Sequence, residues 1–253
     1  MSSSCSPALK MVIDLDGTIL FAEERPDALM IQGRRRNSFI AAETLAALQG
    51  WEIIIATGRS IRSALSIRAI MEEQGLKITG VVAENGGAII THSTSLLTTS
   101  IWQDEISLFK RGTIAHLSEF ATCLALLKPS PEELLQARSR LSQEHYLLLD
   151  GNKTFVFEKG IGKRQGLELL LGDELGSCCG MGNDMNDLDW LEVVGIPASP
   201  GGVSQEVEAL VRSRQGIVAV KKGHDAIPEI IRTLKSRVSK RLLESTEEAS
   251  FSS

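Results

Sequence analysis

Two aspartates stand one residue apart at the end of an apolar run, in the segment KMVIDLDGTIL (residues 10–20). Carboxylates this close repel each other, and each is costly to remove from water unless something compensates its charge. A bound cation would offset the repulsion between Asp14 and Asp16. An exposed turn in water is the simple alternative. A calcium loop is disfavoured because its twelfth position, which requires Glu, is Arg25.

Polar residues also follow three later apolar runs, each of which is a predicted strand. These residues are Thr57, Gly58, Arg59, Glu84, Asn85, Asn183, Asp184, Asn186 and Asp187. Lys163 opens a later predicted helix. Because ligands bind at the carboxyl ends of the strands in open α/β sheets, we expect these groups to converge on one crevice.

The order of the elements predicts the sheet that would bring them together. Apolar runs at 11–14, 51–56 and 78–83 are interrupted by helical patterns at 38–49 and 60–75. Strand-helix alternation is typical of a parallel sheet covered by helices. The alternation resumes after residue 159, so the sequence predicts an α/β fold with a Rossmann-like parallel sheet.

The middle of the chain has a different pattern and predicts an inserted α+β domain. A hairpin is expected at 88–101, helices at 104–128 and 131–142, and a second hairpin around Asp150-Gly151. We therefore expect a core domain at 1–85 and 160–240, a cap domain at 86–159 and a disordered tail at 241–253.

The grouped residues suit phosphoryl transfer. Carboxylates and an Asn amide oxygen are hard ligands of the kind that Mg²⁺ prefers. Lys163, Thr57 and a glycine turn supply donors for phosphate oxygens. One Asp can attack phosphorus, and a second Asp can protonate the leaving oxygen and later deprotonate water.

The motifs DLDGT, ATGR, the Lys163 helix and GNDMND resemble, in order and spacing, those of the haloacid dehalogenase (HAD) superfamily of phosphatases. The insert, entered through AENGGAI, is similar to the α+β cap of the Cof-type, or type IIB, branch. That branch includes phosphatases of sugar phosphates, phosphoglycolate, sucrose phosphate and mannosyl-3-phosphoglycerate, and also phosphomannomutases. The resemblance covers nearly the whole chain.

The resemblance implies a role for each motif residue. Asp14 would be the nucleophile and a metal ligand, and Asp16 the general acid and base, which also binds the metal through its backbone carbonyl. Thr57 and Lys163 would hold the transferring phosphoryl group. The expected substrate contacts are Gly17, Thr18, Gly58, Arg59, Asn85 and Asn186, and the expected metal ligands are Asp14, Asp16, Asn183 and Asp187, with Asp184 next to them. Residues 20–36 would form a mobile flap, whose Arg34-Arg35-Arg36 face is either solvated or helps anion capture.

One position departs from the family pattern. The last motif usually reads Gly-Asp-x-x-Asn-Asp, and its first Asp is Asn183 in this chain. The site thereby loses a negative charge, and we expect a weaker affinity for Mg²⁺ than a carboxylate would give.

Composition limits the partners. The net charge of −5 and the pI of about 5.5 argue against a nucleic-acid-binding surface. The four cysteines have no C-x-x-C spacing, and neither a signal peptide nor an apolar run of membrane-spanning length is apparent, so a cytoplasmic protein is expected.

These expectations lead to a Mg²⁺-dependent phosphomonoesterase for a small phosphorylated metabolite. Cap residues such as Arg111, Lys128 and Lys153 would select the substrate. A phosphomutase of the phosphomannomutase type and a weakly catalytic phosphate-binding regulator remain as alternatives, and the oligomeric state stays open. Asn183 is the feature that favours the regulator.

Overall fold

The computed structural model describes residues 9–33, 36–98, 116–117, 119–141, 143–150 and 153–251. The chain divides into two compact units. Unit 1 comprises Met1–Ile54, Ile70–Ile78 and Asp173–Ser253, and unit 2 comprises Ile55–Ala69 and Thr79–Gly172. The segment predicted as a cap, 86–159, lies inside unit 2, and its predicted boundaries stay a prediction.

Unit 1 holds a parallel sheet with the strand order β14-β13-β12-β1-β4. Its strands are β1 (Lys10–Ile13), β4 (Glu52–Ala56), β12 (Cys179–Met181), β13 (Ile196–Ser199) and β14 (Ile217–Val218). β12 pairs in parallel with both β1 and β13, and β13 pairs in parallel with β14. Met11, Val12 and Ile13 of β1 are fully buried. Burial on both faces explains why this strand is apolar without alternation.

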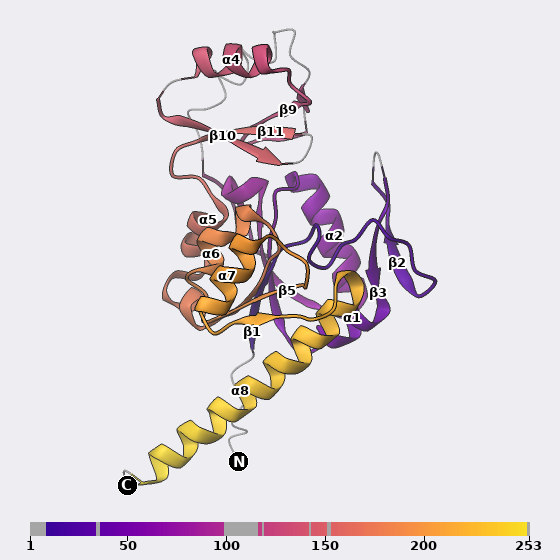
Figure 1. The fold of residues 1–253 in the computed structure, drawn as a ribbon, viewed down its shortest axis with the longest axis vertical. Helices are drawn as coiled ribbons and strands as arrows, with labels where there is room; N and C mark the ends of the chain where they lie inside the picture. Colours follow the sequence, from indigo (N-terminus) through magenta and orange to yellow (C-terminus); the bar gives the residue numbers. More distant parts are fainter. Residues whose placement is uncertain are drawn as a thin grey trace. The chain divides into compact units, whose positions relative to one another are not determined.

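Helices of unit 1 follow the strands, as the alternation predicts. They are α6 (Leu188–Leu191), α7 (Gln205–Ser213) and α8 (Ala226–Phe251), with the short 3-10 helices η2 (Gly172–Ser177), η3 (Met185–Asp187) and η4 (Gly223–Asp225). Figure 1 shows α8 as one long helix that continues through 241–251, where a disordered tail was expected. The helix in 241–251 differs from that expectation. Its physical reason is that the stretch contains neither Gly nor Pro and includes several strong helix formers. No described helix is long and apolar enough to cross a membrane.

A hairpin replaces part of the helix predicted at 38–49. Strand β3 (Ser38–Ala41) pairs antiparallel with β2 (Ala28–Ile31), and helix α1 begins only at Ala42 and ends at Ala47. Phe39 also exchanges backbone hydrogen bonds with Phe21. The prediction was wrong for these four residues because antiparallel pairing with β2 overrides a local apolar pattern that suits either structure.

The part of the sheet in unit 2 continues from β4 with the order β4-β5-β6-β7. The elements that lie mostly or wholly in unit 2 are α2 (Ile61–Glu73), β5 (Lys77–Ala83), the 3-10 helix η1 (Glu84–Gly86), β6 (Ala88–Ile90), β7 (Ser95–Leu97) and α5 (Lys163–Leu171). β6 pairs antiparallel with β5 and with β7, which confirms the hairpin predicted at 88–101 as far as Leu97. The fold class is thus α/β with a mainly parallel central sheet, as predicted.

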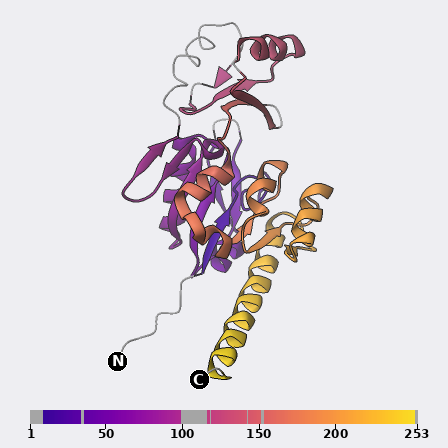
Figure 2. The same ribbon diagram turned by 90° about the vertical axis from the view of Figure 1, so that its left-hand side faces the viewer.

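A second sheet in unit 2 has the order β10-β11-β9-β8 and is antiparallel. Its elements are β8 (His116–Leu117), β9 (Leu124–Leu127), α4 (Pro131–Arg140), β10 (His145–Asp150) and β11 (Lys153–Glu158). Figure 2 shows α4 beside these strands, and its Ala137 packs with Leu124, Leu126 and Val156. Phe120, Cys123, Ala125, Phe155 and Phe157 form a separate cluster on the other face.

This sheet corrects the helix expected at 104–128. Residues 124–127 form a central strand, because their apolar run, LALL, pairs with β11 on one side and with β8 on the other. Residues 104–115 lie outside the described residues. The helix expected at 131–142 and the hairpin around Asp150-Gly151 are confirmed by α4, β10 and β11, although the turn itself, 151–152, is not described.

The three described cysteines, Cys123, Cys178 and Cys179, are buried free thiols. Burial raises the pKa of the Cys178 thiol to about 11, and it raises that of Cys123 well above its usual value. Because the folded pKa of Cys178 exceeds its unfolded value, the stability that this thiol contributes is fully present below about pH 9 and is lost toward pH 11.

We therefore expect slow alkylation of these cysteines in the native protein. In a Cys5→Ser background at pH 8, iodoacetamide should leave Cys123, Cys178 and Cys179 unmodified, and denaturation should expose all three, which peptide mapping by mass spectrometry would measure. Modification of native Cys178 at the rate of a free thiol would contradict the burial argument.

Candidate active site

Asp14 and Asp16 differ sharply in exposure. Asp14 directly follows β1, its backbone N–H donates to Met181 O of β12 at 2.9 Å, and its side chain is buried, with 5% exposed. Asp16 lies in the next turn and is exposed. The turn closes through the N–H groups of Thr18, Ile19 and Leu20, which all donate to Leu15 O. One carboxylate is therefore fixed by the sheet while the other faces solvent.

Asn183 lies beside both aspartates and completes a group that we call the Asp14 cluster: Asp14, Asp16, Thr18 and Asn183. One end of the Asn183 side-chain amide lies 3.2 Å from Asp14 Oδ2, 3.0 Å from the Asp16 carbonyl oxygen and 2.8 Å from Thr18 Oγ1. The Thr18 hydroxyl in turn donates to Asp14 Oδ2 at 3.4 Å. A side chain at Gly17, whose φ is +78°, would clash with this amide, so the DLDGT glycine makes room for Asn183.

Asp187 holds the loop that carries Asn183. Its Oδ2 accepts hydrogen bonds from the N–H groups of Asn183 (3.0 Å) and Asp184 (3.1 Å), and its Oδ1 accepts one from Trp190 Nε1 at 3.0 Å. Asp187 is fully buried, whereas Asp184 is exposed and caps η3 by accepting from Met185 N–H. These bonds give Asp187 a structural role, and its direct coordination of a metal stays a prediction.

The Asp14 cluster offers oxygen atoms that could hold a metal ion. The described residues contain no group of three or more His, Cys, Asp or Glu side chains placed to hold a metal. However, Asp14 Oδ2 and the Asp16 carbonyl oxygen both lie about one contact distance from the same amide, at 3.2 and 3.0 Å. The Asn183 amide can present its own oxygen beside these two. Three oxygen atoms placed this close together fit a hard cation such as Mg²⁺.

Unit 2 contains a second set of buried polar residues, the Thr57 cluster: Thr57, Asn85 and Lys163. They are 1%, 4% and 5% exposed, respectively. Thr57 follows β4; its N–H donates to Val82 O at 2.8 Å and its carbonyl accepts from Asn85 N–H at 3.0 Å. The Arg59 N–H donates to Thr57 Oγ1 at 3.2 Å, while the Arg59 guanidinium donates to Ser63 Oγ. The loop after β4 and the turn after β5 are thus tied together.

The turn after β5 adopts an unusual backbone. Glu84 and Asn85 both have left-handed conformations, with φ of +51° and +52°. Asn tolerates this region, but Glu rarely adopts it, and the strain is sustained by surrounding hydrogen bonds. One of these is from Glu84 N–H to Arg59 O at 3.0 Å. Asn85 also packs against Gly58, where an added side-chain carbon would lie 3.0 Å from its amide oxygen.

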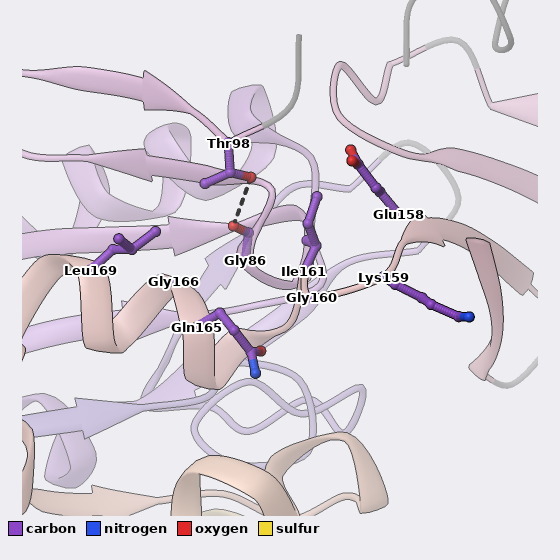
Figure 3. A pocket seen from close by; sticks show the side chains of 9 residues that line it. All are labelled: Gly86, Thr98, Glu158, Lys159, Gly160, Ile161, Gln165, Gly166 and Leu169. Carbon is purple, nitrogen blue, oxygen red and sulfur yellow. Dashed lines mark hydrogen bonds between the residues drawn. The ribbon is translucent and has the colours of Figure 1, made fainter. Parts of the chain in front are cut away.

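Lys163 is positioned by close glycine contacts. It is the first residue of α5, and the preceding Gly162 lies so near Gly86 that a side chain on Gly86 would clash with the Gly162 carbonyl. Gly166, one turn further, packs against Val82 and Gly86. Figure 3 shows Gly86 and Gly166 side by side at the edge of a cavity of about 220 Å³. The start of α5 is therefore pressed against the turn that carries Asn85.

Glu84 links this turn to the predicted cap. Its carboxylate is fully buried and accepts hydrogen bonds from Ala121 N–H (2.9 Å), Thr122 N–H (2.7 Å) and Thr122 Oγ1 (2.7 Å). It also accepts from the N–H of Ile61, the first residue of α2, at 3.2 Å. A carboxylate is favoured at a helix N-terminus, so Glu84 both caps α2 and fastens the segment 121–122.

The start of the predicted flap is fastened within unit 1. The His224 ring packs edge-on against Phe21, with ring centroids 4.7 Å apart, and its Nε2 lies 3.0 Å from Glu23 O. Arg25 forms an ion pair with Asp225 at 2.7 Å, which lowers the pKa of Asp225. Arg34 and Arg35 of the flap lie outside the described residues.

The structure therefore brings the predicted site residues together within two clusters, one in each unit, and their joining into one site stays a prediction. Asn186 is half-buried in η3, between Asp184 and Asp187. Of the predicted substrate-selecting residues, Lys128 is exposed and the Lys153 ammonium lies 5.6 Å from the centre of the Phe155 ring. Arg111 lies outside the described residues.

Comparison with known proteins agrees with this architecture. Residues 11–112 match the family model of haloacid dehalogenase-like hydrolases. No curated protein matches the chain significantly. A sugar phosphatase of HAD subclass IIB superposes with a TM-score of 0.65 at 16% identity, over 90% of this chain and 99% of that one. A HAD/COF-like hydrolase from Plasmodium vivax superposes with a TM-score of 0.64 at 14% identity, over 92% and 97%.

A third solved structure, of a phosphoryl-transfer superfamily member described with a trigonal-bipyramidal intermediate, has a TM-score of 0.64 at 16% identity, over 89% of this chain and 98% of that one. At such identities the likeness establishes the fold alone. Together with the family match over residues 11–112, it agrees with the resemblance that the motifs indicate: residues 11–112 are similar to haloacid dehalogenase-like hydrolases, and the chain shares its fold with subclass IIB and COF-like members of that superfamily.

Proposed function

We propose that this protein is a Mg²⁺-dependent phosphomonoesterase that acts on a small phosphorylated metabolite. The observation that carries the proposal is the buried Asp14 carboxylate, held by Thr18 and Asn183 beside the Asp16 carbonyl. Such fixed geometry suits a nucleophile, because the attacking oxygen must be aligned with the phosphorus before reaction. The family match over residues 11–112 supports this chemistry.

Each residue of the Asp14 cluster has a step in this mechanism. An Asp14 carboxylate oxygen attacks phosphorus while the bond to the leaving alcohol oxygen breaks, which gives an aspartyl-phosphate. Asp16, which is exposed, gives a proton to the leaving oxygen and then takes one from water. That water attacks the aspartyl-phosphate, releasing phosphate and restoring Asp14. A cation held by Asp14, the Asp16 carbonyl and Asn183 would supply charge stabilisation for the phosphoryl oxygens.

The Thr57 cluster would bind the phosphoryl group. The Thr57 hydroxyl, the Asn85 amide and the Lys163 ammonium are donors, and their burial strengthens a charge-assisted hydrogen bond to phosphate. Asn85 N–H donates to Thr57 O, and Gly86, next to Asn85, contacts Gly162, next to Lys163. These contacts hold the three residues on neighbouring turns, which supports a shared role in binding phosphate. Gly58 and Arg59 shape the Thr57 loop.

The substrate proposed is a small phosphate ester. A cap of about seventy residues would enclose a metabolite more readily than a phosphoprotein. The relative of subclass IIB is a sugar phosphatase, so sugar phosphates head the candidates, with glycosyl phosphoglycerates and phosphoglycolate next. We also propose a cytoplasmic location, because the described cysteines are free thiols, and no nucleic-acid partner, because the net charge is −5.

Release of inorganic phosphate from a panel of sugar phosphates, phosphoglycolate and glycosyl phosphoglycerates would test the proposal, with each compound assayed in excess Mg²⁺ and in EDTA. We expect at least one compound to release phosphate, and EDTA to suppress that release. Analysis of the products separates the alternatives: a hexose phosphate isomer would indicate a mutase. Binding of the same compounds without turnover would contradict the proposal and favour the regulator.

A further inference from the structure

The 3-10 helix η4 contacts the chain that leaves the DLDGT turn. The buried His224 ring packs edge-on against Phe21, with ring centroids 4.7 Å apart, and its Nε2 lies 3.0 Å from the carbonyl oxygen of Glu23. Because a carbonyl oxygen can only accept, Nε2 carries the hydrogen and donates it. Asp225, the next residue, forms an ion pair with Arg25 at 2.7 Å. We call these three contacts, all within unit 1, the η4 clamp.

The η4 clamp is anchored on the side of η4. This short helix leads directly into α8, whose Ala226 and Ile227 are fully buried. The loop before η4 is also fixed to α8, because the N–H groups of Val220 and Lys221 donate to the Glu229 carboxylate at 2.9 and 3.1 Å. The contacts of the clamp are therefore made by a part of the chain that packing and hydrogen bonds hold in place.

Leu20 connects the η4 clamp to the turn that carries Asp16. The Leu20 carbonyl accepts from Gly17 N–H at 2.8 Å, and the Leu20 N–H donates to Leu15 O at 2.8 Å. Asp16 and Leu20 also form an isolated β-bridge, and Leu20 itself is buried. Because the Asp16 side chain is exposed, the backbone of this turn sets where its carboxylate lies. A shift of Phe21, which directly follows Leu20, would therefore move Asp16.

We propose that His224 is a positioning residue that holds Asp16 where it can protonate the leaving oxygen. The inference rests on the proposed function, in which Asp16 gives its proton to the ester oxygen as the bond from that oxygen to phosphorus breaks. An alkyl alcohol such as a sugar hydroxyl needs this proton, whereas p-nitrophenol is acidic enough to leave as its anion. Loss of the clamp should therefore slow the hydrolysis of alkyl phosphates and hardly affect p-nitrophenyl phosphate.

The kcat/KM values for these two kinds of substrate would test the inference, because kcat/KM reports transition-state stabilisation relative to the free enzyme and substrate. We expect His224→Leu to lower kcat/KM by about 10- to 100-fold on the best alkyl phosphate of the panel, and by less than about threefold on p-nitrophenyl phosphate. His224→Gln keeps an N–H donor for the Glu23 carbonyl and should stay within about threefold of the wild type on both substrates.

Leu175→Ala is the matched control, because it removes a buried side chain of unit 1 outside the η4 clamp. It should lower stability and leave the ratio of the two kcat/KM values unchanged. In an Asp16→Asn background, His224→Leu should change kcat/KM on the alkyl phosphate by less than about threefold, since no acid remains to be misplaced. If His224→Leu folds poorly, Phe21→Leu removes the ring contact from the other side and should shift the ratio in the same direction.

Hydrogen exchange tests the structural link without substrate. His224→Leu should speed the exchange of the Gly17, Leu20 and Phe21 amides by about fivefold or more, whereas Leu175→Ala should not single out these amides. The inference is overturned if these amides exchange as in the wild type, or if both substrates lose kcat/KM equally. A protein that hydrolyses neither substrate would instead overturn the proposed function, and with it the role of Asp16 on which this inference rests.

Discussion

Replacement of Asp14 by asparagine is expected to lower the rate of phosphate release by about 10³-fold or more, while the protein stays folded. The amide has nearly the shape of the carboxylate but lacks the negatively charged oxygen that would attack phosphorus. A loss of this size corresponds to about 4 kcal/mol of transition-state stabilisation. The measurement is kcat on the best compound of the substrate panel, with the melting temperature measured on the same sample.

Asp173→Asn is the matched control for this prediction. Asp173 lies in η2 of unit 1 and is exposed, so the same chemical change there should leave kcat within about twofold. If Asp14→Asn kept more than a tenth of the wild-type rate, Asp14 could not be the nucleophile. The proposed aspartyl-phosphate mechanism would then have to be abandoned, even if phosphatase activity itself were real.

The second large effect is expected at Glu84, on stability rather than chemistry. Glu84→Ala would remove a fully buried carboxylate and leave the N–H groups of Ile61, Ala121 and Thr122 without their acceptor. A buried donor left unsatisfied costs about 1–3 kcal/mol, so we expect the free energy of unfolding to fall by roughly 3–5 kcal/mol. Chemical denaturation monitored by circular dichroism would measure this change.

Two further variants give this prediction its control. Glu73→Ala removes an exposed carboxylate from the end of α2 and should change stability by less than about 0.5 kcal/mol. Glu84→Gln keeps the shape but turns an amide nitrogen toward donors, so its stability should fall between that of the wild type and Glu84→Ala. A Glu84→Ala protein as stable as Glu73→Ala would show that the carboxylate does not fasten the 121–122 segment.

Much of the fold followed from local patterns. Met11, Val12 and Ile13 are apolar without alternation, and burial on both faces is the physical reason that this pattern indicates a parallel strand. The predictions failed where an apolar segment suits a helix and a strand equally well, as at 38–41 and 124–127. In both segments pairing with another strand decides the outcome, and the apolar pattern of the segment alone does not reveal that pairing.

The sequence by itself determined which residues could carry chemistry: two aspartates after one strand, Thr57 after another and a lysine at the start of a helix. Only the tertiary structure decided what these groups do to one another. Asn183 meets the DLDGT turn across 165 positions of chain, and Glu84 meets Thr122 across 38. The contacts of the Asn183 amide and the burial of the Glu84 carboxylate depend on such distant partners, because hydrogen bonding and desolvation are set by neighbours in space.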